Sequence, residues 1–158
     1  MTTPIEVMPV AELVDLVNRW GTLPSELDGR RPAAGDHPLR ALADELHPVF
    51  AASDDGTRAT LVTGLLKAAG VRPALADRGG ALHDSWTVED PDQSARASAA
   101  LTLRHHLAEH PGRIGVCADQ QCADVYVDAS PAGRRRFCCI TCQNRSRAAA
   151  FRRRKQMG

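Results

Sequence analysis

Apolar side chains recur along the first twenty residues at the spacing of an α-helix. The pattern begins at Val10, ends at Trp20, and is followed by Gly21, a residue type that commonly ends helices. Residues 21–37 contain several Gly, Pro and Arg residues, and we expect them to form a loop. The chain is therefore predicted to begin with one amphipathic helix followed by an irregular connection.

A second helical pattern starts after this connection. Asp36 is a candidate N-cap, and Pro38 falls in the first turn, where its missing N–H costs nothing. Proline inside a helix removes a hydrogen bond and restricts the residue before it. We therefore expect Pro48 to end or kink this helix near His47.

A third helical pattern runs from about Thr57 to Ala69, with Gly70 as its stop. The next segment, residues 71–90, is expected to be mostly irregular, with a turn at Gly79-Gly80 and a short strand from Leu82 to Val88.

A fourth, longer helix is predicted to follow. Asp90-Pro91-Asp92-Gln93 resembles a capping box, the helix should reach about Glu109, and His110-Pro111-Gly112 should end it. The predicted fold class is therefore mainly α.

Composition supports a helical body without a membrane segment. Apolar residues make up 43% of the 158 residues and aromatic residues only 4%, so the core must consist mainly of Leu, Val and Ala. No stretch of about 18 apolar residues occurs, and the N-terminus lacks the basic and apolar regions of a signal peptide. We expect a cytoplasmic protein that does not enter a membrane.

Charge divides the chain into two parts. Residues 1–112 carry ten Arg/Lys and sixteen Asp/Glu, a net charge of −6, whereas residues 113–158 carry ten Arg/Lys and three Asp, a net charge of +7. We therefore predict a helical domain at 1–112 and a separate basic module at 113–158. A basic module is typical of proteins that bind phosphate groups, such as those of nucleic acids.

Five cysteines lie in the basic module, at positions 117, 122, 138, 139 and 142. In a reducing compartment, clustered cysteines are metal ligands more often than disulfides. Zn²⁺ takes four thiolates in a tetrahedron, and two pairs of cysteines close in sequence provide them. Cys117 and Cys122 form the first pair; Cys142 pairs with either Cys138 or Cys139. Four thiolates leave no open coordination position, so the zinc is predicted to be structural.

The segment between the two pairs is expected to form a hairpin. Residues 123–128 and 134–137 have the composition of strands, and residues 129–133 that of a turn. The residues after Cys142 strongly favour helix. A cysteine loop, a β-hairpin and a basic helix that carries the last ligand together predict a treble-clef-like module.

Arginines surround the second cysteine pair. Nine cations are candidate nucleic-acid contacts: Arg134, Arg135, Arg136, Arg145, Arg147, Arg152, Arg153, Arg154 and Lys155. The guanidinium group suits bidentate contacts to phosphate and guanine. RNA readers often offer stacking aromatic residues, which are scarce in this segment, so DNA is favoured over RNA.

The C-terminal segment resembles the CGNR-type zinc finger family. The residues that carry this resemblance are Arg113-Ile114-Gly115-Val116-Cys117, Cys122, Val125-Tyr126-Val127-Asp128 with Ser130, Arg135-Arg136-Phe137-Cys138, and Cys142-Gln143-Asn144-Arg145. Gln143 replaces the glycine of the name-giving motif. Relatives carry a single cysteine at the position of Cys138, so the resemblance favours Cys138 over Cys139 as the third ligand.

Upstream, the segment Glu12-Leu13-Val14-Asp15-Leu16-Val17-Asn18 resembles the start of the mostly helical ABATE domain that accompanies this finger. The family is regarded as stress-induced transcription regulators of bacteria. The resemblance therefore implies DNA binding by the finger, and sensing or partner binding by the helical body, which could dimerise or bind a small-molecule effector.

Two other functions compete with DNA regulation. The module could bind an acidic protein surface, including the acidic body of its own chain or of a second subunit. Alternatively, the body could sense a ligand in an apolar pocket near Trp20 or Trp86, with the finger as a structural cap. No nucleophile–base pair or paired carboxylates occur, so we do not expect an enzyme.

Overall fold

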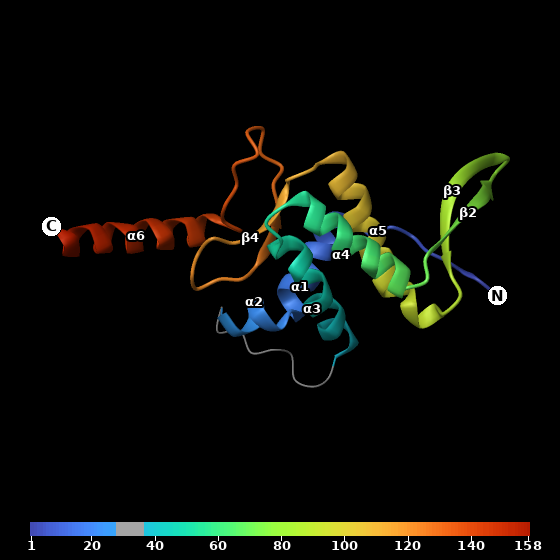
Figure 1. Cartoon of the computed structure of the whole chain (residues 1–158), viewed down its shortest axis with the longest axis horizontal. Helices are drawn as coiled ribbons and strands as arrows, with labels where there is room; N and C mark the ends of the chain where they lie inside the picture. The colour runs from blue at the N-terminus through green and yellow to red at the C-terminus, as the bar shows by residue number, and fades with distance from the viewer. Residues whose placement is uncertain (28–36) are drawn as a thin grey trace. The chain divides into compact units, whose positions relative to one another are not determined.

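The computed structural model describes residues 1–27 and 37–158. Within them the chain forms two compact units, one of residues 1–13 and 53–111 and one of residues 14–52 and 112–158. The described residues are mainly helical, with two small antiparallel sheets (Figure 1). None of the described helices has the length and apolar character needed to cross a bilayer.

The first helices follow the apolar pattern with one addition. The predicted first helix is confirmed as α1, Val10–Trp20. The expected loop is wrong at its start, because Thr22–Leu27 form the short helix α2, and residues 28–36 of it lie outside the described residues. Thr22 donates from both its backbone N–H and its hydroxyl to the carboxylate of Asp44, each over 2.7 Å. This tertiary contact, invisible in the local sequence, stabilises the first turn of α2.

Helix α3 spans Pro38–Ala51 and continues through Pro48, so of the two alternatives predicted near His47, an end or a kink, the end is wrong. Proline inside a helix costs about 3 kcal/mol. Val49 and Phe50, which follow it, are completely or almost completely buried, and burying side chains of this kind contributes about 1.5–3 kcal/mol each. Burial therefore offsets the lost hydrogen bond. The predicted N-cap Asp36 lies outside the described residues; the ring of His37 accepts from the N–H of Leu39 instead.

The unit of residues 1–13 and 53–111 packs two helices beside a sheet. Its helices are α4, Asp55–Ala68, and α5, Ser94–Glu109, which contact each other and confirm the predicted third and fourth helices. Asp54 caps α4 by accepting from the N–H of Thr57. The short 3-10 helix η1, Pro91–Gln93, precedes α5 and is capped by the Asp90 carboxylate.

The sheet of this unit has the order β1-β3-β2, with strands Thr3–Pro4, Ala81–Val88 and Arg72–Arg78. The predicted strand over Leu82–Val88 is confirmed, but the irregular segment before it is wrong, because β2 pairs with β3 along its whole length. Gly79 and Gly80 form the predicted turn with positive φ angles of 67° and 87°. Strand β2 contains Pro, Asp and two Ala, which have little β-propensity, so this turn and the pairing with β3 fix it.

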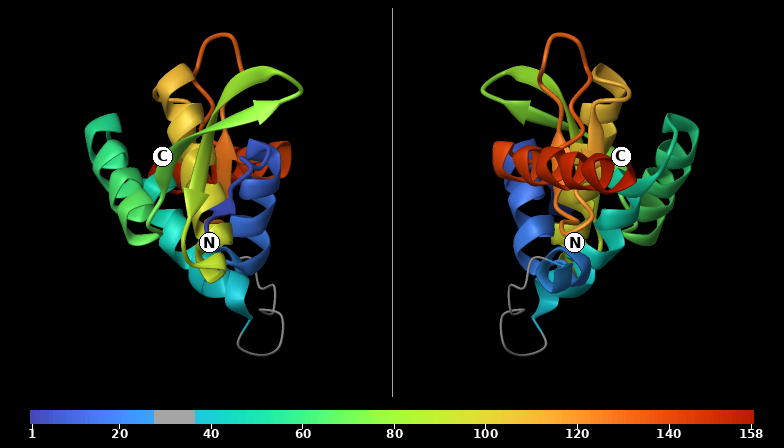
Figure 2. Two further views of the ribbon diagram at one scale, coloured as in Figure 1. Left: turned by 90° about the vertical axis from the view of Figure 1, so that its right-hand side faces the viewer. Right: turned by 90° about the vertical axis from the view of Figure 1, so that its left-hand side faces the viewer.

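The other unit holds the cysteines. Strands β4, Ile114–Val116, and β5, Val125–Val127, pair with each other and pack against α3. The basic helix α6 spans Ile140–Met157 (Figure 2). The predicted hairpin between residues 123–128 and 134–137 is wrong in its pairing, because β5 pairs with the strand that precedes Cys117. Residues 14–52 thus form one compact unit with the module predicted at 113–158.

Candidate zinc centre and basic groove

Four cysteine side chains converge at one end of α6. Cys117 follows β4, Cys122 precedes β5, and Cys138 and Cys142 lie just before and within the first turn of α6. Their Sγ atoms all lie within 4.8 Å of one another. These are the four cysteines named from the sequence together with the family resemblance.

The spacing of the sulfur atoms fits Zn²⁺. A tetrahedral site with Zn–S bonds of about 2.3 Å places its sulfur atoms about 3.8 Å apart. The distance from Cys138 Sγ is 3.8 Å to Cys122 Sγ and 3.6 Å to Cys142 Sγ. A disulfide would need about 2.05 Å. The four thiols therefore fit a bound zinc ion, which would hold the two halves of the module together.

Burial affects the protonation of three of these thiols. Burial is the main cause that raises the pKa of the Cys122, Cys138 and Cys142 thiols above the usual cysteine value. A cation at the centre of the cluster stabilises the thiolate forms that burial disfavours, so metal binding here is coupled to proton release. The N–H of Asp124 also points to Cys122 Sγ at 3.4 Å, which orients that ligand.

Cys139 differs from its four neighbours. It is exposed, lies at the N-cap position of α6, and is not part of the group of four. The N–H of Cys142 lowers the pKa of the Cys139 thiol, because the first turn of a helix presents free donors. Its sulfur lies 3.7 Å from that of Cys138.

Side chains from three segments complete the free edge of β5. In an antiparallel pair, alternate residues turn their backbone groups away from the partner strand. The carbonyl of Ala123 lies 2.9 Å from the His47 ring, and the carbonyl of Val127 accepts from the Arg135 guanidinium. Between them, Asn18 bonds both backbone groups of Val125, donating to its C=O over 3.0 Å and accepting from its N–H over 2.7 Å.

The segment that leads to Cys138 is held by buried polar groups. Asp128 is buried and accepts from the Ser130 hydroxyl and from the N–H groups of Ser130 and Arg135. The bond from the Ser130 hydroxyl is the main cause that lowers the pKa of Asp128 below its ordinary value. The Tyr126 hydroxyl donates to the Arg135 carbonyl over 2.7 Å. This network places Phe137 and Cys138 beside residues 117–122, the first cysteine loop.

Gly115 makes room for that tyrosine. A Cβ atom at this position would lie 2.6 Å from the Tyr126 hydroxyl oxygen and 2.8 Å from the ring carbon that carries it. Any side chain at this position therefore forces the ring to shift, and with it the hydroxyl that donates to Arg135.

Two of the nine predicted nucleic-acid residues form hydrogen bonds or an ion pair within the protein, and the guanidinium of a third, Arg136, lies over the Phe137 ring. Arg145 lies 3.0 Å from the carboxylate of Asp119, a residue of the first cysteine loop that is only 5% exposed. Arg135 donates to the backbone carbonyls of Val127, Phe137 and Cys138. The Arg145 guanidinium joins α6 to the first cysteine loop, and the Arg135 guanidinium joins β5 to the residues just before α6.

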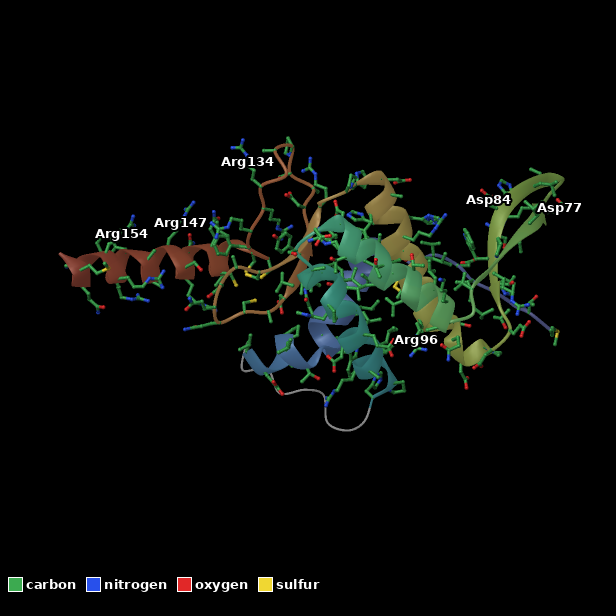
Figure 3. The ribbon with its side chains drawn as sticks, viewed as in Figure 1. Asp77, Asp84, Arg96, Arg134, Arg147 and Arg154 are labelled. Atoms are coloured by element: carbon green, nitrogen blue, oxygen red, sulfur yellow. The ribbon has the colours of Figure 1, made fainter. Side chains whose placement is uncertain are left out.

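A groove of about 790 Å³ lies between α6, the first cysteine loop and the segment before Cys138. Of the residues that line it, Asp119 alone is acidic, and Arg145 pairs with it. The arginines in its lining are Arg134, Arg135, Arg136, Arg145, Arg147, Arg152 and Arg153. The groove brings together seven of the nine predicted cations. Arg154, which is labelled in Figure 3, and Lys155 follow on the exposed end of α6.

The roles of several residues in the site were not predicted from the sequence. Asn18 and His47 lie in helices whose apolar pattern predicts only a core-facing stripe, and Asp119 is a single acid in a basic segment. Their roles arise from partners 107, 76 and 26 positions away along the chain. The large hollow described above is lined by arginines, and neither Trp20 nor Trp86 takes part in it.

Comparison with known proteins agrees with this geometry. Residues 113–155 match the family model of the CGNR zinc finger. Together with the cluster of four cysteines, this match supports zinc as the metal that the module binds. No curated protein matches the chain.

Proposed function

We propose that the chain is a transcription regulator that binds DNA through the arginine-lined groove and the exposed half of α6. The observation that carries this proposal is the groove itself, in which seven arginines face one acid that is already paired. A cluster of positively charged side chains attracts polyanions, and guanidinium groups bind phosphate oxygens in a bidentate manner.

The metal does not cancel this charge. Residues 113–158 carry a net charge of +7. Four thiolates and one Zn²⁺ add a net charge of about −2, so the metal-bound module keeps about +5. A structural zinc centre therefore leaves the basic face available, and its role is to fix the backbone that presents the arginines.

Internal bonding limits how many cations can contact phosphate. Setting aside Arg135 and Arg145 leaves seven candidates: Arg134, Arg136, Arg147, Arg152, Arg153, Arg154 and Lys155. Each phosphate that a cation neutralises contributes about 0.9 to the slope of log affinity against log salt. The full set would give a slope of about −6 on duplex DNA.

The test is fluorescence anisotropy of a labelled duplex, titrated with the zinc-loaded full chain at several salt concentrations. The groove variant carries Arg134→Gln, Arg136→Gln and Arg147→Gln. It should bind more weakly and reduce the salt slope by up to about 2.7, which is 0.9 for each lost contact.

A matched control removes the same charge elsewhere. The control variant carries Arg19→Gln, Arg72→Gln and Arg78→Gln, all at exposed positions outside the groove. It should keep the wild-type slope. Equal losses in both variants, or no binding by the wild type at 50 mM salt, would refute the proposal. Stronger binding to single-stranded RNA than to duplex DNA would refute the choice of nucleic acid.

Other parts of the sequence-based hypothesis belong to the same proposal. The cysteine loop, β5 and α6 support a treble-clef-like description of the module. The helical segment upstream is proposed to be an ABATE-type sensing domain, and the whole protein to act in the cytoplasm without catalysing a reaction.

A further inference from the structure

The hairpin of β2 and β3 separates its side chains by chemistry. Register pairs Leu75 with Asp84 and Asp77 with Leu82, so these four residues share one face of the hairpin. The opposite face carries small or basic residues, such as Ala76, Arg78, Ala81 and His83. One face is therefore apolar and acidic, and the other is small and basic.

The apolar and acidic face leaves its leucines unburied. Leu75 is 70% exposed and Leu82 71% exposed. The same face continues toward the base of β3 into Trp86 and into the fully buried Val88, which belong to the core of this unit. Because the hairpin extends beyond α4 and α5, the apolar surface continues from the core into solvent (Figure 1). Exposed leucines that continue a core surface are typical of a docking site.

Helix α6 carries the complementary surface. Phe151 is 60% exposed. Its neighbours on the helix surface are three cations: Arg147, four residues before Phe151, and Arg154 and Lys155, three and four residues after it. All three cations are exposed, and Figure 3 labels Arg147 and Arg154 on α6. On α6, the exposed Phe151 ring therefore lies among three positive charges. On the hairpin, the exposed side chains of Leu75 and Leu82 lie beside two carboxylates.

We propose that α6 of a second copy of this chain docks on the acidic and apolar face of the β2–β3 hairpin. Phe151 packs between Leu75 and Leu82, and the surrounding cations pair with Asp77 and Asp84. Charge complementarity selects this occupant. Contact between two identical hairpin faces would instead bring four carboxylates together, which is unfavourable.

The docking has a regulatory consequence that rests on the proposed function. Arg147 lines the groove, and Arg154 and Lys155 continue from it along α6. A second copy that covers these cations competes with DNA for them. Self-association and DNA binding should therefore exclude each other, and salt should weaken both.

Photochemical cross-linking tests the contact in the zinc-loaded full chain. The photoreactive residue p-benzoylphenylalanine replaces Leu82 on the docking face or, as a control, Ala81 on the opposite face of the same strand. Leu82 should give a cross-linked dimer with the attachment mapped to residues near Phe151, at least about five times more than Ala81. Mixing isotopically heavy and light chains shows whether each link joins two copies. A link within one chain, or equal yields from both positions, overturns the proposal.

A charge exchange gives the second test. Asp77→Lys with Asp84→Lys, and separately Arg154→Glu with Lys155→Glu, should each reduce the dimer yield about fivefold in the presence of the Leu82 probe. With the Leu82 probe placed only on the chain that carries Asp77→Lys and Asp84→Lys, a mixture of the two variants should restore the yield, because the favourable partner of that hairpin is the Glu-bearing α6 of the other variant. Circular dichroism and zinc content check that each variant folds. Lack of restoration between folded variants refutes the docking geometry.

Failure of this proposal is distinct from failure of DNA binding. If the chain binds duplex DNA but gives no specific cross-link, docking is refuted and the proposed function stands. If the cross-link forms and DNA does not bind, the reverse holds.

Discussion

The substitution Asn18→Ala tests whether residues 14–52 support the zinc module. Asn18 is the only side chain described as bonding both backbone groups of Val125, and Val125 is 1% exposed. Because the pairing with β4 turns these groups away from the sheet, β4 cannot replace the lost partner. Alanine keeps the helix α1 intact and removes only the amide.

The size of the effect follows from the two groups left without partners. Leaving a buried donor or acceptor unsatisfied costs about 1–3 kcal/mol. Two such groups give a destabilisation of about 2–5 kcal/mol, allowing for partial relaxation. In a chain of this length that corresponds to a fall in the melting temperature of about 4–20 °C.

Urea unfolding in excess zinc measures this loss, since excess metal keeps the centre loaded while the free energy of unfolding is compared. Asp15→Ala is the control, an exposed position on the same helix that should change stability by less than about 0.5 kcal/mol. A change in Asn18→Ala as small as that in the control would refute the reasoning, because the two hydrogen bonds would then contribute nothing.

Three further predictions address other parts of the molecule. Cys138→Ser should lose bound zinc while Cys139→Ser retains it, as measured by native mass spectrometry; the opposite result would exchange the two ligand assignments. Gly115→Ala should lower the free energy of unfolding by about 1–3 kcal/mol, because its Cβ overlaps Tyr126, whereas Gly64→Ala, in open space on α4, should raise it by about 0.5–1 kcal/mol. The hydrogen bond from the N–H of Thr57 is the main cause that lowers the pKa of Asp54 below 3.8. The contribution of the ionised Asp54 carboxylate to stability is therefore complete above pH 3.8 and is lost as the pH falls through the folded-state pKa. Asp54→Asn should therefore show a flatter acid limb in thermal unfolding, and parallel limbs would contradict this.

The sequence predicted most clearly what local periodicity and cysteine spacing determine. Helix α1 matches its expected ends, and α4 and α5 lie within a few residues of theirs. The hairpin around Val125–Val127 was misassigned because alternation of apolar residues does not name the partner strand. The groups of residues 134–137 that could have paired with it bond elsewhere: the Arg136 carbonyl accepts from Ala118, and the Arg135 N–H donates to Asp128.

The basic residues show a different limit of sequence reasoning. A charge count treats nine cations alike, but their environments divide them. Arg135 binds three carbonyls, and Arg145 pairs with a buried acid, so both are fixed by atoms of the protein. No local pattern distinguishes them from Arg136 or Arg147, because the partners are set by the tertiary fold.

The same tertiary contacts bear on where the zinc module ends. The family match begins at residue 113, and the charge also changes sign there. Small zinc modules owe most of their folding energy to the metal. Here the strand beside the cysteines has a second support, because Asn18 satisfies Val125 and His47 lies within hydrogen-bonding distance of the carbonyl next to Cys122. A change that moves α1 or α3 therefore acts on the backbone that holds a zinc ligand, so these two helices contribute to the stability of the zinc module.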